Sequence, residues 1–473
     1  MPSSSESKNC REACWRIPNT WPVRMVRRFP NRSTIPTAIC AVTCLVGAGQ
    51  TPSRPIDPGV RPGTPDAGGA VAGVDAQYFA NVRGAFNQVH SIAGDLESGA
   101  GLGPRFNGTS CGGCHAYPSP GGSSPRRNPQ LAMAAAHGAR NTIPAFVKAD
   151  GPVLAVRVKQ NVGAIESGSV LPLFTVSGRT DAYGCALAQP SFGDARNLSF
   201  RIPTPLFGGG LIDNIPDTAI LANKGSQTVK KRALGIGGRP NISAGGAVGK
   251  FGWKAQHHSL TSFAKEAYQI EMGVRSGASY YRLEPLNESC YAVYDAAYDD
   301  PNFAASYDQN EGSSVMLFTE FMRFLDAPRS VDEFPGALPE SIRKGRRIFK
   351  RTGCVLCHTQ SLRTGSQSDL SAQNSRDALL YSDLLLHRMG PKLADGAIQG
   401  RAASDEFRTA PLWGVGQRIF FLHDGRTTDL LAAILEHASG DSETRSEASE
   451  VIDRFHQLSP PEQQDLLNFL RSL

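Results

Sequence analysis

The chain has 473 residues, of which 40% are hydrophobic, and this length suits two or three domains that each bury a core. The formal net charge of +6 is small for this length and no long basic block occurs, so we do not expect nucleic acid as a partner. The 49 glycines and 32 prolines favour long loops between few and short helices.

Residues 1–48 are predicted to be an export signal, with Met25 as an alternative true start. A basic stretch after Met25 leads into an apolar run at 35–46, and small residues at 46–48 suit cleavage. The apolar run is too short for a permanent membrane span, and no other segment is long enough. We therefore expect a soluble periplasmic protein without a transmembrane segment. A lipid anchor at Cys44 is a less favoured alternative, because threonine is a poor residue before a lipidated cysteine.

The composition of the sequence after residue 48 indicates a linker followed by folded domains. Residues 49–74 are rich in proline and glycine and lack apolar periodicity, which predicts a flexible linker. Two domains are expected after it, at 75–330 and 331–473, and the first carries insertions.

Two short motifs carry the clearest chemistry. The stretches "SCGGCHAY" and "TGCVLCHT" both read C-x-x-C-H, a pattern in which two thiols attach a haem covalently and the histidine ligates its iron. A zinc site would need a second closely spaced ligand pair, and a redox dithiol would not need the histidine. The sequence therefore predicts two c-type haems, held by Cys111, Cys114 and His115 and by Cys354, Cys357 and His358.

The remaining cysteines bear on the compartment. Four of the ten lie in the predicted export segment and four in the two motifs, which leaves Cys185 and Cys290. In an oxidising compartment this pair is expected to form a disulfide, and two free buried thiols are the alternative.

The second half has the pattern of a cytochrome c. Residues 338–354 predict a helix that leads into the motif, with Ile342, Gly345 and Phe349 on one face. The glycine would let another helix cross closely, and the apolar stripe of 459–473 supplies a candidate. The first half begins in the same way at 76–90. The expected fold is mainly α with many loops, as two cytochrome c-like domains that each carry one covalently bound haem.

An internal echo supports two related domains. "PLFGGG" at 205–210 and "PLWGVG" at 411–416 share Pro-Leu-aromatic-Gly-x-Gly, and each follows one of the two motifs. This arrangement suggests a duplication.

The stretches "SCGGCH", "RIPTPLFGGGLIDNIPD", "GKFGWKAQ", "YSDLLLHRMGPKLADG", "EFRTAPLWGVG" and "FLHDGRTTDLLAAILEH" together resemble the di-haem oxidoreductases, which are related to bacterial di-haem cytochrome c peroxidases. The resemblance covers about residues 75–473. It implies that the C-terminal haem takes electrons from a small cytochrome or copper protein, and that the N-terminal haem reduces peroxide or activates oxygen. A non-catalytic di-haem electron-transfer cytochrome is the alternative. Calcium is known among the related peroxidases, but no ligand cluster for it can be named here.

The distal ligand of the C-terminal haem has more than one candidate. Leu430, Ile434 and His437 share one helix face, which would bury the imidazole, and the resemblance places a ligand after the "HDG" motif. Met389 has the spacing from its motif that an ordinary cytochrome c methionine has and is the alternative. His423, within "HDG", is expected to be structural or to lie next to the haem.

The N-terminal haem is expected to be the site of chemistry. Peroxide cleavage needs a group that moves a proton between the two oxygens. The resemblance assigns this role to Glu271, with Met272 as a rival sixth ligand, and makes Trp253 an electron relay between the haems. His257 and His258 depart from the family pattern, and either could reach the first iron.

Overall fold

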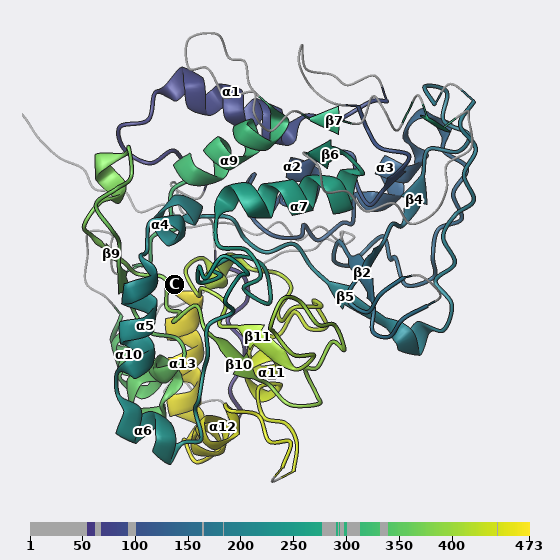
Figure 1. Cartoon of the computed structure of the whole chain (residues 1–473). Helices are drawn as coiled ribbons and strands as arrows, with labels where there is room; N and C mark the ends of the chain where they lie inside the picture. Colours follow the sequence, from purple (N-terminus) through teal and green to yellow (C-terminus); the bar gives the residue numbers. More distant parts are fainter. Residues whose placement is uncertain are drawn as a thin grey trace, which may run out of the picture. The chain divides into compact units, whose positions relative to one another are not determined.

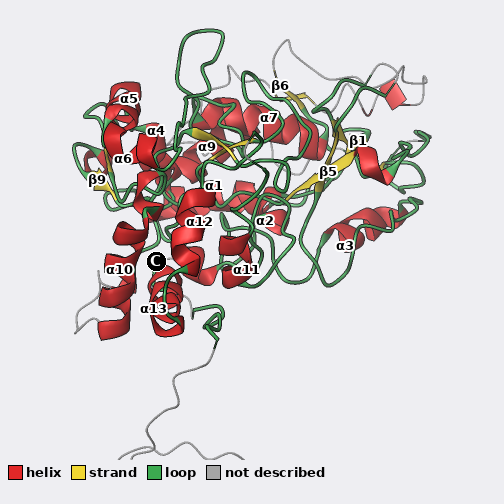
Figure 2. Ribbon diagram, turned by 90° about the horizontal axis from the view of Figure 1, so that it is seen from below, coloured by secondary structure: helices red, strands yellow, loops and turns green. Residues whose placement is uncertain are grey.

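The computed structural model describes residues 54–61, 68–92, 101–162, 165–182, 184–276, 290–291, 293, 298–299, 313–331, 339–441 and 443–473. Their secondary structure is a mixture of helices, small sheets and many loops (Figure 2). The predicted export segment and its four cysteines lie outside these residues. None of the described helices is long and apolar enough to span a membrane.

The α-helices are α1 (Ala76–Asn87), α2 (Cys111–Cys114), α3 (Gln130–Ala135), α4 (Gly209–Asp213), α5 (Asp217–Gly225), α6 (Thr228–Ala233), α7 (Leu260–Met272), α9 (Ser314–Phe324), α10 (Glu340–Thr352), α11 (Leu430–Leu435), α12 (Ser449–His456) and α13 (Pro460–Arg471). The strands are β1 (Arg105–Phe106), β2 (Ala155–Val158), β3 (Val170–Leu171), β4 (Phe174–Thr175), β5 (Leu198–Arg201), β6 (Arg275–Ser276), β7 (Tyr298–Asp299), β8 (Leu362–Arg363), β9 (Asp377–Ala378), β10 (Leu386–Arg388) and β11 (Glu406–Arg408).

The described strands form small sheets of two or three strands. β2 is the centre of a three-stranded antiparallel sheet in the order β3-β2-β5, where Val156 pairs with both Leu171 and Phe200. β10 and β11 form an antiparallel pair in which Leu386 lies opposite Arg408. The pairs β1-β4 and β8-β9 are also antiparallel, whereas β6 and β7 run parallel.

In the second half, helix α10 is crossed by α13, as the sequence predicts (Figure 1). A Cβ atom on Gly345 of α10 would lie 2.0 Å from the carbonyl oxygen of Asp465 and 2.6 Å from the Cβ of Phe469. The glycine is therefore required where α13 crosses, which confirms its predicted role. Phe349 packs against Phe469 with ring centroids 5.5 Å apart, and it lies on the face of α10 that meets the second motif.

The first half uses α1 and α9 in the same way, although the sequence did not point to α9. Here aromatic rings form the contact between the two helices that Gly345 allows in the second half. The ring centroid of Phe86 in α1 lies 4.4 Å from that of Phe321 in α9, and the ring centroid of Phe79 lies 5.8 Å from that of Phe321. Figure 1 shows α1 and α9 side by side. Each motif thus follows a helix that is crossed by a later helix. The predicted boundary between 330 and 331 stays a prediction.

The structure confirms that the two Pro-Leu-aromatic-Gly-x-Gly stretches occupy equivalent places. Gly208 and Gly414 both have left-handed backbones, with φ of 69° and 71°. A Cβ on Gly210 would lie 2.2 Å from the carbonyl oxygen of Arg323 at the end of α9, and a Cβ on Gly416 would lie 2.1 Å from that of Arg471 at the end of α13. Each stretch therefore packs against the last turn of its own crossing helix, because only glycine allows so close an approach.

Part of the predicted flexible linker is held in place. Asp57 accepts hydrogen bonds from the guanidinium of Arg471 in α13 and from the backbone N–H of Leu430, at 2.6–2.7 Å. The side chain of Gln464 donates to the carbonyl oxygen of Ile56 at 2.9 Å. These contacts hold Ile56 and Asp57 against the C-terminal part of the chain, and the proline and glycine content did not predict them. The predicted linker at 49–74 stays a prediction.

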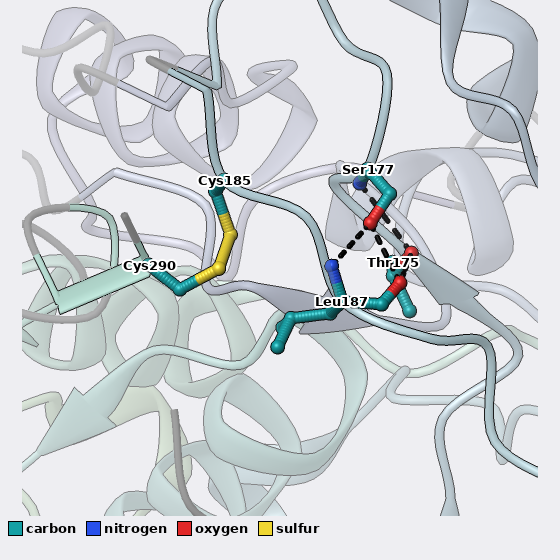
Figure 3. The surroundings of a disulfide bond; sticks show 5 residues. All are labelled: Thr175, Ser177, Cys185, Leu187 and Cys290. Atoms are coloured by element: carbon teal, nitrogen blue, oxygen red, sulfur yellow. Dashed lines mark hydrogen bonds between the residues drawn. A yellow bond between two sulfur atoms is a disulfide. The ribbon is translucent and has the colours of Figure 1, made fainter. Parts of the chain in front are cut away.

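Cys185 and Cys290 form a disulfide, which confirms the favoured prediction for this pair (Figure 3). The loop that carries Cys185 is fixed nearby, because the Ser177 hydroxyl donates to the carbonyl oxygen of Leu187 at 2.6 Å and accepts from the Leu187 N–H at 2.5 Å. The covalent link joins residues that are 105 positions apart in the chain.

Two glycine substitutions test the helix crossing. Gly345→Val would drive its side chain into the backbone of α13 and should lower the free energy of unfolding by about 1–3 kcal/mol. Gly84→Ala is the matched control on α1, because a Cβ there meets nothing within 4 Å. It should leave stability unchanged or raise it by up to about 1 kcal/mol. Urea unfolding followed by circular dichroism measures both. If both substitutions changed the free energy of unfolding by the same amount, the close crossing of α10 by α13 at Gly345 would be contradicted.

Candidate functional site

Each C-x-x-C-H motif lies in the wall of a large cavity. The first cavity, around Cys111 to His115, encloses about 1110 Å³ of empty space with its open mouth included. The second cavity, around Cys354 to His358, encloses about 1440 Å³ by the same measure. Both are large enough for a cofactor of the size of a haem, and their walls are mainly apolar.

The motif histidines are held in the same way in both cavities. The Nδ1–H of His115 donates to the carbonyl oxygen of Gly122, and that of His358 donates to the carbonyl oxygen of Tyr381, each at 3.0 Å. This bond leaves Nε2 with its lone pair to ligate a metal. Burial lowers the pKa of both imidazoles to about 4 despite these hydrogen bonds, which keeps the rings neutral.

The loops behind the histidines are also repeated. The N–H of Leu206 donates to the carbonyl oxygen of Gly121, one residue before the acceptor of His115. In the second half the N–H of Leu412 donates to the carbonyl oxygen of Leu380, again one residue before the acceptor. Leu206 and Leu412 are equivalent in the two Pro-Leu-aromatic-Gly-x-Gly stretches and line the first and second cavity. These stretches therefore position the motif histidines.

Three of the four motif cysteines, Cys111, Cys114 and Cys354, are buried in a way that disfavours the thiolate. Burial raises the pKa of Cys111 and of Cys354 to about 12, and it raises the pKa of Cys114 as well. A redox dithiol or a zinc site would lower these values. The four motif cysteines form no disulfide, and no group of three or more His, Cys, Asp or Glu in the described part is arranged to hold a metal ion.

The second cavity brings together both predicted distal ligands. His437 follows α11, and its Nδ1–H donates to the carbonyl oxygen of Ala433 at 2.8 Å, which leaves Nε2 with its lone pair as in the motif histidines. Met389 lines the same cavity. His423 is buried beside them and stacks on Phe407 with ring centroids 4.4 Å apart. Burial lowers the pKa of both His437 and His423.

His387, which sequence reasoning missed, also lines the second cavity. Its Nδ1 is 2.7 Å from a carboxylate oxygen of Glu447 and its Nε2 is 3.0 Å from one of Asp383. Its Nδ1 also lies 3.7 Å from the Sγ of the motif cysteine Cys357. Cys357 and then Asp383 raise the pKa of this imidazole well above its usual value against the effect of burial, so it is a structural cation. No pattern in the sequence signals it, because Glu447 is 60 residues away along the chain.

The first cavity contains carboxylates instead of further histidines. Glu271 lies in the last turn of α7, where its carbonyl oxygen accepts from the N–H groups of Asn107 and Gly108 at 2.7 and 3.0 Å. Burial raises the pKa of its carboxyl to about 7, although a hydrogen bond from Asn107 and the charge of Arg157 act in the opposite direction. A carboxyl with such a pKa can both take and return a proton near neutral pH.

The histidines that departed from the family pattern do not line this cavity. His257 forms a short ion pair through Nε2 with Glu266, and its Nδ1 lies 3.3 Å from the hydroxyl of Ser262. His258 is exposed. The two ring nitrogens of His257 are thus both engaged within the protein.

Trp253 is part of the wall of both cavities. The residue is 8% exposed, and its Nε1–H donates to the carbonyl oxygen of Ile202 at 2.9 Å. Its ring meets the ring of His423 in an edge-to-face arrangement with the centroids 6.4 Å apart. The halves also exchange backbone bonds here. Arg408 donates its N–H to the carbonyl oxygen of Trp253, and Ile202 donates to that of His423. Trp253 is therefore fixed between the two motifs.

Trp253 and His423 occupy equivalent places in a repeated loop. Phe251 bridges to His257 in one loop and Phe421 to Thr427 in the other, so the two loops differ by 421 − 251 = 170 positions. The backbones agree, since Gly252 and Leu422 have φ of 81° and 67°, and Ala255 and Gly425 have φ of 49° and 69°.

The same offset continues into the following helices. α7 and α11 begin at Leu260 and Leu430, which are also 170 positions apart. The counterpart of His437 is then residue 267, because 437 − 170 = 267, and this residue is Ala267. Ala267 lines the first cavity as His437 lines the second. The first cavity therefore has a methyl group at the position where the second has an imidazole.

Comparison with known proteins identifies the family. Residues 169–473 match the family model described as "Di-haem oxidoreductase, putative peroxidase", a range that includes the second motif and begins after the first. No curated protein matches the chain.

Two solved structures are similar to parts of the chain. One is a MauG-like protein associated with microbial copper homeostasis, with 17% identity, 55% of this chain and 90% of that chain covered, and a TM-score of 0.27. The other is hydrazine synthase of Kuenenia stuttgartiensis, with 17% identity, 34% of this chain and 57% of that chain covered, and a TM-score of 0.23. The family model matches well over half of the chain, so the protein belongs to the di-haem oxidoreductase family and its cofactor is haem.

Proposed function

We propose that the protein is a periplasmic di-haem c-type oxidoreductase that reduces peroxide at the first motif with electrons delivered through the second. Cys111 and Cys114 would attach one haem and Cys354 and Cys357 the other, with His115 and His358 as ligands to iron. The alternative reaction at the same cavity is the activation of oxygen. The un-ionised thiols of Cys111, Cys114 and Cys354 fit covalent attachment, and the lone pair on Nε2 of each motif histidine fits ligation of iron.

The observation that carries the proposal is the difference between two equivalent positions. His437 faces the second cavity, whereas its counterpart in the first is Ala267. A haem with two protein ligands can only pass electrons, and one with an open side can bind a small oxidant. This difference favours electron transfer at the second motif and chemistry at the first.

The first cavity has the groups that peroxide reduction needs. Haem iron supplies the open coordination position and the electrons when it is bound. Reduction of hydrogen peroxide consumes two electrons and two protons and yields two waters. Glu271, with a pKa of about 7, can take a proton from one peroxide oxygen and return it to the other, which then leaves as water. Arg157 lines the same cavity and would supply a positive charge to a peroxide bound there.

Trp253 is the candidate electron path, because it is part of both cavity walls and its indole is one of the more easily oxidised side chains. The Cys185–Cys290 disulfide suits an oxidising compartment and so favours export. A small cytochrome or copper protein is the proposed electron donor. The alternative of a non-catalytic carrier requires Met272 or another side chain to close the first cavity.

Glu271→Gln should slow peroxide turnover by about 10²-fold or more with the haem spectra unchanged, because glutamine cannot transfer the proton. Glu320→Gln is the matched control, because burial also raises the pKa of the Glu320 carboxyl. Glu320 is part of α9 but does not line the cavity. Stopped-flow measurement of peroxide consumption at pH 7 reads both out.

The pH profile separates a proton-transfer role from a structural one. Only ionised Glu271 can accept a proton, so turnover by the unaltered protein should rise with pH through about 7 and fall about tenfold for each pH unit well below it. Glu271→Gln should remove this dependence. A variant that kept the same slope, or full activity, would exclude Glu271 from the reaction.

The distal ligand is tested by two substitutions in the second cavity. His437→Gly should convert the low-spin signal of one haem to high spin, because glycine leaves that coordination position open, whereas Met389→Ala should not. Absorption and electron paramagnetic resonance spectra of the oxidised variants report the spin state. A change seen only in Met389→Ala would transfer the assignment to the methionine.

A further inference from the structure

Arginine burial follows a pattern that the two haem motifs alone do not explain. In the described part of the chain six arginines are buried. Arg179, Arg201 and Arg471 each form an ion pair with an aspartate. The other three, Arg157, Arg408 and Arg418, form none with any described residue, and all three line a cavity that contains a motif.

Arg408 and Arg418 lie together in the wall of the second cavity. Arg408 ends β11, and its Nε–H donates to the carbonyl oxygen of Gly252 at 2.9 Å. The Nε of Arg418 is buried without a hydrogen-bond partner. The terminal nitrogens of both guanidinium groups make no hydrogen bond to a described residue. Both side chains also line a smaller cavity beside Trp253, between the two Pro-Leu-aromatic-Gly-x-Gly stretches.

Two neighbouring cations in this environment need an anion. Arg408 is 8% and Arg418 9% exposed. Burial lowers the pKa of Arg418 to about 10, and burial together with the charge of Arg418 lowers the pKa of Arg408 to about 10. Removing a charge from water is strongly unfavourable unless the charge is paired. Guanidinium groups bind carboxylates through two parallel hydrogen bonds, so a pair of carboxylates in the cavity would satisfy both side chains.

We propose that Arg408 and Arg418 bind the two carboxylate groups of the haem attached at Cys354 and Cys357. This inference rests on the proposed function for the second motif and adds the residues that orient its cofactor. Since the backbone N–H of Arg408 donates to the carbonyl oxygen of Trp253, the arginine pair fixes the carboxylate edge of that haem next to the Trp253 loop. The side of the cofactor nearest the proposed electron path is thereby set by two residues.

The test is a potentiometric titration of the haem-loaded full chain, with spectra recorded at each potential. Arg408→Gln and Arg418→Gln should each lower the midpoint potential of one haem, and the double variant should lower it further, because loss of a cation favours the ferric form. Arg408→Lys retains the positive charge, so its midpoint potential should stay close to that of the unaltered protein. Arg351→Gln is the control. It removes the same charge from the exposed last turn of α10, directly before the second motif, and should change neither potential.

The outcomes separate the two proposals. A pyridine haemochrome assay first counts the haems, and fewer than two in the unaltered protein would refute the proposed function. Two haems with unchanged potentials in the glutamine variants would overturn the arginine assignment alone, as would an equal shift in Arg351→Gln. If the pair held a free carboxylate instead, added acetate would shift the potential of the unaltered protein but not that of the double variant, which would also overturn the assignment.

Discussion

One hydrogen bond on each motif histidine is the constraint on which the rest of the site depends. A neutral imidazole can ligate a metal in a fixed direction only if its other nitrogen is held, and here Nδ1 of His115 and of His358 donates to a backbone carbonyl at 3.0 Å. The acceptors lie in loops that the two Pro-Leu-aromatic-Gly-x-Gly stretches hold through a second backbone bond. Those stretches in turn need their glycines in order to pack against the ends of α9 and α13. In each half, one continuous series of contacts therefore links the crossing of the two helices, the loop behind the motif histidine and the direction in which that histidine can ligate a metal.

The duplicated framework makes the differences between the halves informative. The loops that carry Trp253 and His423 share their bridge and their left-handed backbones, and the helices after them begin in register. Within this common frame one half has His437 and the other Ala267, with Glu271 one turn beyond it. We infer that a methyl group, a carboxyl with a pKa of about 7 and a nearby arginine would leave the first haem accessible to a small oxidant, whereas the imidazole of His437 would occupy the equivalent position at the second. These side-chain differences are sufficient for the roles that we propose, electron transfer at the second motif and peroxide reduction at the first.

The sequence was sufficient for features that are local. The C-x-x-C-H spacing, the periodicity around Gly345 and Phe349, and the repeated Pro-Leu-aromatic-Gly-x-Gly stretch are all read within a few residues. Partners far apart in the chain were not predictable. The ion pair of Asp57 with Arg471, the contact of His387 with Glu447, and the lack of a described carboxylate paired with Arg408 or Arg418 are visible only in the folded chain. The equivalence of Ala267 and His437 also escaped sequence reasoning, because the two helices share almost no identity and only the backbone reveals their register.

The most direct measurement of the central claim is an electron paramagnetic resonance spectrum of the oxidised protein, recorded before and after the addition of hydrogen peroxide. One haem open beside Ala267 and one closed by a second ligand predict a mixture of high-spin and low-spin ferric signals, of which peroxide removes the high-spin part. Two low-spin signals that peroxide does not change, both before and after partial reduction, would contradict the account and make the protein an electron carrier.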